Sequence, residues 1–516
     1  MGGNTMGKQM LAGIDVGTTG VKVMLFDMQG AVLGSAYEEY QCIYLKTGWV
    51  EQNPDMLIQA VYRTCRTVIR NTGVNVGDIQ GVSVSAQRSC TVFVSQAGTP
   101  IKMISWLDNR AVDEVKEIDA AIGKERFYDI TGLPLCATWI LPKLLHVRKN
   151  QPELWKKTAK VCQLQDLILR ALGVDGYFGN EPEAGFWGLW DNRSMRFHEE
   201  LLSTFSINRS LLPEIRQVGE QVGRITEKTS ALTGFAPGMP ICVGIGDQNS
   251  AAVGAGIVTP GAVSVSLGTG GLATALLQDC YRDPLGQAMV TSHAIHGMWT
   301  FEGLQNAAAG VYRWFRDEIA ALEKQNAKQS GGNAYELLNQ MIGSVPVGAK
   351  GLLMLPYFAG SAAPRWDTSA RGGFIGLTLS HDRACMARAC VEGITLEEKD
   401  ILNSLTSIGQ EFSYVRIVGG ATRSEVWNQI QADIYNLPCE TLAVSDAAAL
   451  GAAISAGAGV GAFESIEQGA GKMVHVKRRY EPDPERAAVY EKLYSVYCNT
   501  FEALADAQVF RDLAQF

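Results

Sequence analysis

The sequence predicts an α/β protein of two similar lobes, each a mixed β-sheet flanked by helices. Apolar β-branched runs alternate with amphipathic helical runs along the chain. A glycine- and threonine-rich loop at Gly17–Gly20 is echoed by Gly268–Gly270 in the second half. The chain has 516 residues, more than a single hydrophobic core usually serves. We therefore expect a first domain at residues 10–256 and a second at residues 257–516.

The first stretch that indicates chemistry is Met10–Asp27, where two apolar runs flank the loop Gly17–Gly20. Val, Ile and Phe favour paired strands, so this stretch predicts a β-hairpin. The loop glycines allow a sharp turn, and successive amides with the Thr18 and Thr19 hydroxyls form an anion-binding nest. Asp15 at the mouth of the loop would repel phosphate unless Mg²⁺ lies between them. The alternative is an ordinary hairpin with an aspartate near its turn.

Candidate substrate contacts follow the next predicted strand of the first domain. Gln87 and Arg88 come directly after the strand Ile79–Ser85. Open α/β sheets present ligand-binding residues beyond the carboxyl ends of their strands, so this is a natural place for a substrate contact. A surface ion pair is the structural alternative for Arg88.

The candidate catalytic base is Asp247, which ends the apolar run Ile241–Gly246. Phosphoryl transfer needs donors around the phosphates, Mg²⁺ to offset charge, and a base for the attacking hydroxyl. Small residues around Asp247 leave room for a ligand, and polar Gln248 follows it. We assign Asp247 as general base and, with Asp15, as a metal ligand. The alternative is that Asp247 caps the next helix, Ser250–Ala255.

The second half contains further glycine-rich turns after apolar strands. Gly268, Thr269 and Gly270 close the β-rich run Ala262–Ala273, and Gly310 lies inside the predicted helix Gly303–Asp317. A glycine inside a helix costs roughly 1 kcal/mol relative to alanine, which indicates a close approach there.

A third turn follows the predicted strand Val415–Val418. This turn is Gly419-Gly420-Ala421, and Asn428 lies in the helix after it. The uncharged run Ala447–Phe463 is too short and too weakly hydrophobic for a membrane span, so we expect a buried helix in the second domain.

Together, these loops and acids resemble the FGGY carbohydrate kinases, which have the actin–hexokinase–Hsp70 (ribonuclease H-like) nucleotide-binding fold. The resemblance implies ATP and Mg²⁺ as cofactors, with the ATP and sugar in a cleft between two actin-like lobes. Gly246-Asp247-Gln248 matches the segment that carries the family's catalytic aspartate. The family's positions for sugar contacts fall on Gln87, Arg88, Trp106, Asp108, Asp247 and Gln248. At these positions Arg88 and Asp108 could hold sugar hydroxyl groups, and Trp106 offers a flat apolar wall. The structural alternatives are a turn former for Asp108 and a core aromatic for Trp106. The family's nucleotide contacts fall on Gly17, Thr18, Thr19, Gly268, Thr269, Gly270, Gly310, Gly419, Gly420, Ala421 and Asn428.

The pattern around the sugar contacts gives mixed signals about the substrate. Arg88 matches the glycerol kinase pattern and Ser89 does not, while xylulokinases carry Met-His at these two positions. Thr138 and Leu272 stand where a glycerol pocket has aromatic side chains, which predicts a roomier pocket. We expect a ketopentose such as xylulose. Glycerol, another polyol, gluconate and an autoinducer-2-type substrate remain alternatives.

Composition excludes several classes of function. A formal net charge of −8 argues against a nucleic-acid partner, and the 11 scattered cysteines indicate reduced thiols in a cytoplasmic protein. The start of the chain has no signal-peptide pattern, and no membrane association is expected. A homodimer is an open alternative for the assembly. A non-catalytic actin-like ATP-binding protein is a more remote alternative, and a sugar-sensing repressor lacks room for a DNA-binding helix-turn-helix.

Overall fold

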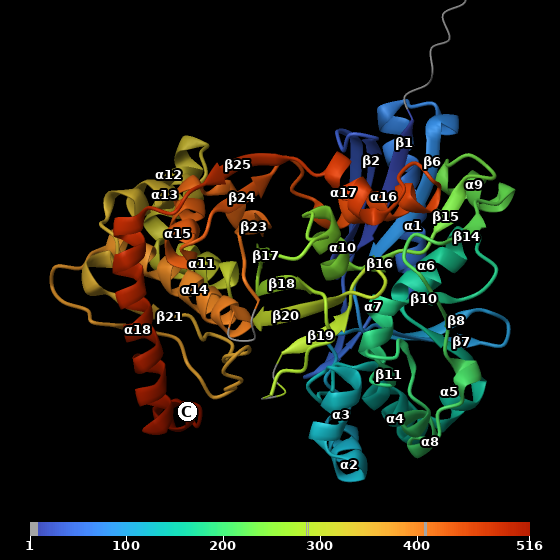
Figure 1. Ribbon diagram of the computed structural model, residues 1–516, viewed down its shortest axis with the longest axis horizontal. Helices are drawn as coiled ribbons and strands as arrows, with labels where there is room; N and C mark the ends of the chain where they lie inside the picture. Colours follow the sequence, from blue (N-terminus) through green and yellow to red (C-terminus); the bar gives the residue numbers. More distant parts are fainter. Residues whose placement is uncertain (1–8, 285, 287, 407–409) are drawn as a thin grey trace, which may run out of the picture. The chain divides into compact units, whose positions relative to one another are not determined.

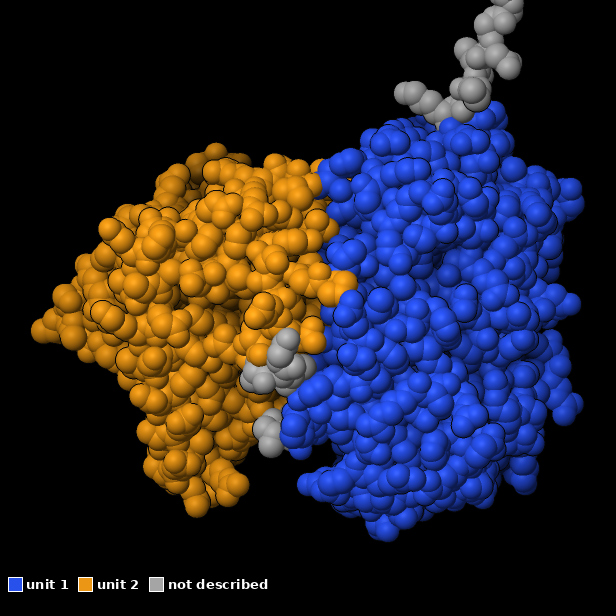
Figure 2. Space-filling model, in the orientation of Figure 1, with its two compact units in different colours: residues 1–259, 276–301, 446–475 blue, residues 260–275, 302–445, 476–516 orange. Residues whose placement is uncertain are grey.

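The fold was analysed in a computed structural model, which describes residues 9–284, 286, 288–406 and 410–516. The chain forms two compact units (Figure 2), and neither is contiguous in sequence. Unit 1 comprises Met1–Thr259, Leu276–Phe301 and Asp446–His475. Unit 2 comprises Pro260–Ala275, Glu302–Ser445 and Val476–Phe516.

The main sheet of unit 1 is mixed, and the predicted hairpin lies within it (Figure 1). Its strand order is β14-β15-β6-β1-β2-β3, and β16 also pairs with β6. Strands β1 and β2 are antiparallel, whereas β6 runs parallel to β1. The bounds are β1 Met10–Val16, β2 Gly20–Asp27, β3 Val32–Glu39, β6 Ile79–Ala86, β14 Gln221–Arg224, β15 Pro240–Cys242 and β16 Ile245–Gly246.

A second sheet of unit 1 has the order β4-β5-β8-β7-β9. Its strands are β4 Ile43–Lys46, β5 Trp49–Glu51, β7 Thr91–Ser95, β8 Pro100–Ile104 and β9 Thr158–Cys162. The remaining strands are β10 Phe178–Asn180, β11 Trp190–Asp191, β12 Arg196–Phe197, β13 Glu214–Arg216 and β19 Met289–Ser292. The helices are α1 Pro54–Thr72, α2 Val112–Ile122, α3 Lys124–Thr131, α4 Ile140–Asn150, α5 Pro152–Lys157, α6 Leu164–Leu172, α7 Glu181–Ala184, α8 Glu199–Thr204, α9 Glu227–Thr233, α10 Asp247–Gly254, α16 Ala447–Gly459 and α17 Ile466–Met473.

The main sheet of unit 2 repeats the local topology of unit 1. Strands run in the order β20-β18-β17-β23-β24-β25, with an antiparallel hairpin β17–β18 and the strand β23 parallel to β17. The strands are β17 Ala262–Leu267, β18 Gly271–Leu277, β20 Trp299–Gln305, β21 Leu353–Leu355, β22 Gly373–Ile375, β23 Tyr414–Val418, β24 Cys439–Leu442 and β25 Val476–Tyr480. The helices are α11 Ala309–Trp314, α12 Ala321–Ser330, α13 Ala334–Ser344, α14 Arg383–Thr406, α15 Glu425–Tyr435, α18 Pro484–Asp506 and α19 Val509–Leu513.

The compact units differ from the predicted domains at helix α16. We placed this helix in a second domain, but it belongs to unit 1 (Figure 1, beside β1 and β6). Its backbone packs so closely that a Cβ atom on Gly13 would lie 2.0 Å from the Ala449 carbonyl oxygen. A Cβ on Gly254 would lie 1.9 Å from the Ala447 carbonyl oxygen. Glycines far away in the sequence thus create the surface on which α16 packs.

One predicted helix begins later than expected. Residues 303–305 belong to strand β20, and helix α11 starts only at Ala309. A Cβ on Gly303 would lie 2.2 Å from Cγ2 of Ile401, so helix α14 packs closely against this strand position. Within the described ranges, no helix combines the length and apolar character needed to cross a bilayer. All 11 cysteines are described, and each is a free thiol in the structure.

Candidate active site

The first glycine loop is a tight connection in unit 1, held by side chains from neighbouring strands. The Gly17 amide donates to the Gly20 carbonyl oxygen at 3.0 Å, closing the turn. The Tyr40 hydroxyl donates to the Gly17 carbonyl oxygen at 2.5 Å. Gln52 Nε2 donates to the Thr18 carbonyl oxygen at 3.1 Å. Thr19 is exposed, so its hydroxyl is open to a ligand.

Asp15 lies on β1 beside this loop, and its environment disfavours a negative charge. Its Oδ1 accepts a hydrogen bond from the Ser85 hydroxyl on β6 at 2.7 Å. Burial is the main reason that the Asp15 pKa rises to about 7, and the nearby Asp247 carboxylate raises it further. Lys22 acts in the opposite direction. Two carboxylates that repel one another this way are a suitable place for a cation.

Asp247 is the first residue of α10 and directly follows strand β16. The residue at the cap position is Gly246, so the helix-capping alternative for Asp247 is wrong. Oδ1 of Asp247 accepts from the Gln248 amide at 2.8 Å and lies 3.5 Å from Arg88 Nε. The Asp247 side chain keeps 27% of its surface exposed, so a ligand hydroxyl can reach it.

Besides its ion pair with Asp247, Arg88 is held in place by Phe186 and Asn249. Its guanidinium carbon lies 4.5 Å from the centroid of the Phe186 ring, which fits a cation–π contact. Its Nη1 donates to Oδ1 of Asn249 at 3.3 Å. Asn249 is fully buried and donates in turn to the Thr300 hydroxyl at 3.1 Å. Sequence analysis missed Asn249, although it stands two positions after Asp247.

Gln87 and Trp106 differ in how much of each a substrate could reach. Trp106 is 39% exposed, and its Nε1 donates to the Thr18 hydroxyl at 3.0 Å. Gln87 is fully buried, and its Nε2 donates to Oε1 of Gln52 at 2.8 Å. Its own Oε1 has no hydrogen-bond partner among the described residues. Trp106 can form a wall of a sugar site, whereas Gln87 offers only this one unsatisfied acceptor.

Asp108 does not have the environment of a sugar contact. Its side chain is fully buried, and Oδ1 and Oδ2 each accept a hydrogen bond at 2.8 Å from the Arg110 guanidinium. Oδ2 also accepts from the Val50 amide at 2.5 Å. Because both oxygens of Asp108 accept hydrogen bonds and the side chain is closed to solvent, this carboxylate stabilises the turn after Trp106. The structure therefore corrects the predicted role of Asp108.

A buried lysine that sequence analysis missed supports the same region. Lys143 on α4 donates to the carbonyl oxygens of Ser89 at 3.0 Å and Ser105 at 2.9 Å. These carbonyls belong to the residue after Arg88 and the residue before Trp106. Burial lowers the Lys143 pKa to about 8. Nothing in the local sequence distinguishes this lysine from a surface one, because its role depends on two distant segments.

In unit 2, the second glycine loop is also closed by a backbone hydrogen bond of its own, which spans one residue fewer than that of the first. The Gly268 amide donates to the Gly270 carbonyl oxygen at 2.9 Å. The Thr269 carbonyl oxygen accepts from the amides of Ala308 at 2.9 Å and Gly310 at 3.1 Å. A Cβ on Gly310 would lie 2.7 Å from that carbonyl oxygen. The close approach predicted at Gly310 is therefore made by the loop itself.

A pocket of about 430 Å³ opens beside this loop, entirely within unit 2. It brings together predicted nucleotide contacts from three distant segments, Gly268, Thr269, Gly310, Gly420 and Ala421. The other lining residues include the aromatic side chains of Tyr312, Tyr335 and Trp427. Glycine backbone beside aromatic rings suits a ligand with a flat heterocycle and an anionic group.

Three of the nucleotide contacts predicted in unit 2 do not line this pocket: Gly270, Gly419 and Asn428. Gly419 shapes the turn, because its φ of 89° favours glycine. Asn428 is buried, and its Nδ2 donates to the Thr422 carbonyl oxygen at 2.9 Å and to the Tyr480 hydroxyl at 3.2 Å. The structure thus gives Asn428 a supporting role under the turn in place of the predicted direct contact.

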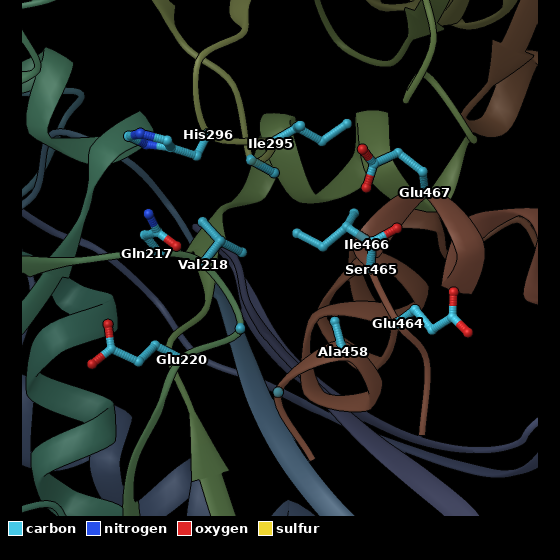
Figure 3. A pocket seen from close by; sticks show the side chains of 13 residues that line it. Gln217, Val218, Glu220, Ile295, His296, Ala458, Glu464, Ser465, Ile466 and Glu467 are labelled. Atoms are coloured by element: carbon cyan, nitrogen blue, oxygen red, sulfur yellow. The ribbon is translucent and has the colours of Figure 1, made fainter. Parts of the chain in front are cut away.

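Unit 1 contains another pocket, of about 500 Å³, that does not involve these residues (Figure 3). Its walls carry the carboxylates of Glu220, Glu464 and Glu467 and the imidazole of His296. None of the predicted site residues lines it. We therefore do not include this pocket in the candidate active site.

Two units that each place a closed glycine loop at the turn of a β-hairpin, one with two acids beside its loop, define an actin-like phosphotransferase. The FGGY carbohydrate kinase N-terminal domain matches residues 10–254, and the C-terminal domain of the same family matches residues 263–460. The chain belongs to the FGGY family of carbohydrate kinases and is an ATP-dependent sugar kinase. This finding favours the kinase over the non-catalytic protein and the repressor.

Named relatives cover almost the whole chain. A xylulose kinase from Staphylococcus epidermidis is 28% identical over 95% of this chain and 96% of its own length. A gluconokinase from Bacillus licheniformis is 27% identical over 96% of both chains. The crystal structure of a ligand-bound xylulose kinase from Lactobacillus acidophilus is 25% identical, with a TM-score of 0.88, and covers 96% of this chain and 98% of its own. The predicted two-lobed fold class is confirmed.

Proposed function

We propose that this kinase phosphorylates a hydroxyl group of a ketopentose such as xylulose, with Asp247 as general base. The observation that carries the proposal is the position of Asp247. Its partly exposed carboxylate lies at the end of a strand, beside Arg88 and within electrostatic reach of Asp15. A general base assists phosphoryl transfer to an alcohol by accepting the proton of the hydroxyl group, whereas a protein that only binds ATP needs no such base.

The chemistry assigned to these residues is an in-line displacement. Asp247 accepts the proton of the sugar hydroxyl as the oxygen forms its bond to the terminal phosphorus of ATP. The bond between that phosphorus and the oxygen that stays on ADP breaks, and the bonding electrons leave with ADP. Arg88 keeps Asp247 oriented, and the wall of Trp106 limits where the sugar can lie.

Asp15 and Asp247 fit a Mg²⁺ ion, although no group of three or more His, Cys, Asp or Glu side chains converges among the described residues. Mg²⁺ in phosphoryl transfer is usually held by one or two carboxylates together with substrate phosphates, so two acids suffice. The partly exposed Asp247 carboxylate, which lies within electrostatic reach of Asp15, is the observation that supports this fit. When bound, Mg²⁺ would offset the charge of the phosphate oxygens.

The nucleotide contacts divide between two sets of residues. We assign the adenosine part of ATP to the pocket of unit 2, where Tyr312, Tyr335 and Trp427 offer flat surfaces. Amides at Gly268–Gly270 and at Gly17–Thr19 are assigned to the phosphates. Both loops are closed by their own hydrogen bonds, which leaves the outward-facing amides of each turn for an anion.

The choice of a ketopentose rests on the relatives and on the roomier pocket predicted from Thr138 and Leu272. Relatives named xylulose kinase and gluconokinase have similar identity to this chain, so gluconate is the leading alternative. Glycerol, other polyols and an autoinducer-2-type substrate follow. The cytoplasmic location and a homodimeric state stay predictions.

The proposal is tested by measuring ADP release with ATP and Mg²⁺ against a panel of pentuloses, polyols, glycerol and aldonates. We expect D-xylulose to give the highest kcat/KM in this panel and ATP hydrolysis without sugar to be slow. A higher kcat/KM for gluconate would make gluconate the proposed substrate in place of the ketopentose. Turnover independent of any added sugar would contradict the assigned chemistry.

A further inference from the structure

Gln52 links a proposed substrate contact to the first glycine loop. It lies directly after strand β5 and before helix α1, and only 3% of its surface is exposed. Its Oε1 accepts from Gln87 Nε2 at 2.8 Å, while its own Nε2 donates to the Thr18 carbonyl oxygen at 3.1 Å. One amide group therefore joins Gln87 to the loop.

Thr18 is the point at which two such connections meet. Its carbonyl oxygen accepts from Gln52, and its hydroxyl oxygen accepts from Trp106 Nε1 at 3.0 Å. Trp106 is the exposed wall of the proposed sugar site, and Gln87 has an unsatisfied acceptor among the described residues. Both proposed sugar contacts in this part of unit 1 are thus hydrogen-bonded, directly or through Gln52, to the same loop residue.

We propose that Gln52 is a positioning residue that couples occupancy of the sugar site to the conformation of the loop Gly17–Gly20. This inference rests on the proposed function, because Gln87 and Trp106 are sugar contacts only there. A glycine loop has many accessible backbone conformations, so a buried donor to its carbonyl group restricts it effectively. A sugar bound to Gln87 and Trp106 restricts the motion of both side chains. Trp106 donates to the Thr18 hydroxyl and Gln87 is bonded to Gln52, which donates to the Thr18 carbonyl group, so the same sugar also restricts the groups that hold Thr18. If bound sugar strengthens the binding of a phosphate at the loop, then by linkage bound phosphate strengthens sugar binding by the same factor.

Two substitutions separate the two bonds of Gln52. Gln52→Glu keeps an acceptor for Gln87 but replaces the donor to Thr18 by an oxygen that repels the carbonyl group. Gln52→Leu removes both bonds. The matched control is Gln165→Leu, because Gln165 is also buried and its side chain bonds to Asp166, Phe178, Asn180 and Gly244, none of which belongs to the loop.

The first measurement is hydrogen–deuterium exchange of the peptide that spans Gly17–Gly20, made on the full chain without ligands. A lost hydrogen bond of ordinary strength should speed exchange there about tenfold in both Gln52 variants. Gln165→Leu should leave the exchange rate of this peptide unchanged, even if it lowers the melting temperature by as much as the Gln52 substitutions do. Unchanged exchange in both Gln52 variants, or an equal change in the control, would overturn the proposal.

The second measurement divides the effect between the two substrates. Gln52→Glu should raise KM for MgATP about tenfold while the Kd for D-xylulose alone stays within about twofold of wild type, because the lost bond is the one to the loop. A rise in the sugar Kd with an unchanged KM for MgATP would also overturn the coupling role. If wild-type protein turned over none of the sugars, the proposed function would fail, and the exchange experiment would still decide whether Gln52 holds the loop.

Discussion

At the scale of single residues, Asp247 and Asp108 show how environment separates two aspartates with similar sequence surroundings. Both follow an apolar run and precede polar residues. Asp108 is fully buried with both oxygens bonded to Arg110, whereas Asp247 keeps an exposed carboxylate beside Arg88. Only the second can exchange a proton with a bound hydroxyl. Both lie beside an arginine, so the difference is that Asp108 is closed to solvent with both oxygens bonded, whereas the Asp247 side chain keeps 27% of its surface exposed.

Asp247→Asn should lower kcat at least ~100-fold, because the amide has the size of the carboxylate but cannot accept the proton. Binding of ATP should persist, since the pocket assigned to adenosine contains none of these atoms. Steady-state kinetics with the best sugar and calorimetry with ATP measure the two effects. The control Asp175→Asn changes an exposed carboxylate of the same unit and should leave kcat unaltered. A near-normal kcat for Asp247→Asn would refute the assignment of Asp247 as the general base.

At the scale of elements, helix α16 is held by backbone contacts that only glycine permits. A Cβ on Gly451 would lie 1.9 Å from the Ser250 carbonyl oxygen on α10. Neither backbone can move without disturbing the sheet behind it, because Gly13 of β1 is similarly close to Ala449. The position of α10, and with it that of Asp247, therefore depends on the absence of a side chain in α16.

Gly451→Ala should destabilise unit 1 by about 1–3 kcal/mol, the usual cost of overpacking a core. Gly471→Ala is the matched control, because Gly471 lies in helix α17 and a Cβ added there would have no described neighbour within 4 Å. This control should be neutral or stabilising, since alanine favours helix more than glycine does. Thermal unfolding of both variants makes the comparison, and equal melting temperatures would show that α16 can shift.

Helix α14 buries several acids, of which Glu397 accepts a hydrogen bond on its Oε2 from Gln305 Nε2 at 2.8 Å. Both oxygens of Glu398 are buried there without a hydrogen-bond partner among the described residues, as is Oε1 of Gln305. A Cβ on Gly271 would lie 2.1 Å from Glu398 Oε1 and 2.5 Å from Gln305 Oε1, so these oxygens face one another under the second loop. Burial raises the pKa of Glu397 to about 8 and that of Glu398 well above its ordinary value.

These acids should make the folded state less stable as pH rises. Below the unfolded pKa of 4.5, both states bind the protons and nothing is lost. Between pH 4.5 and about 8, the folded chain retains protons that the unfolded chain has released, so the free energy of unfolding falls. Glu398→Leu removes one such proton and should raise the melting temperature at about pH 8 more than at about pH 5.

The control for this prediction is Glu502→Leu, which makes the same change at an exposed position. It should show no such dependence on pH. Melting temperatures from about pH 5 to about pH 8 measure the effect for both variants. A lower melting temperature for Glu398→Leu at the upper end of this range would contradict the prediction, because it would mean that a stabilising partner neutralises the carboxylate.

At the scale of the whole molecule, the parts that could be predicted are those with a local sequence pattern. The hairpin around Gly17–Gly20 and the acid at the end of β16 follow from strand propensity and glycine turns. Contacts between distant segments could not be predicted in this way. Lys143 reaches two carbonyl oxygens that lie 54 and 38 positions away, and α16 joins unit 1 across most of the chain.

The two units should respond to different ligands. We assign the adenosine pocket to unit 2 and the sugar contacts to unit 1, so each ligand should slow amide exchange in its own unit. MgADP alone should protect the peptides around Gly310 and Gly420. A sugar alone should protect those around Arg88 and Trp106. Ligand binding to the folded state stabilises the segments that it contacts, and segments closed by weak local bonds respond most.

Hydrogen–deuterium exchange on the full chain, with each ligand at about 100 times its Kd, makes this measurement. At that concentration, binding contributes about 2.7 kcal/mol, enough for a clear change in exchange at the contacted segments. Helix α18 lies outside both sets of contacts and serves as an internal control within the same experiment. If MgADP protected only the Arg88 and Trp106 peptides, adenosine would bind in unit 1, and the assignment of the unit 2 pocket would have to be abandoned.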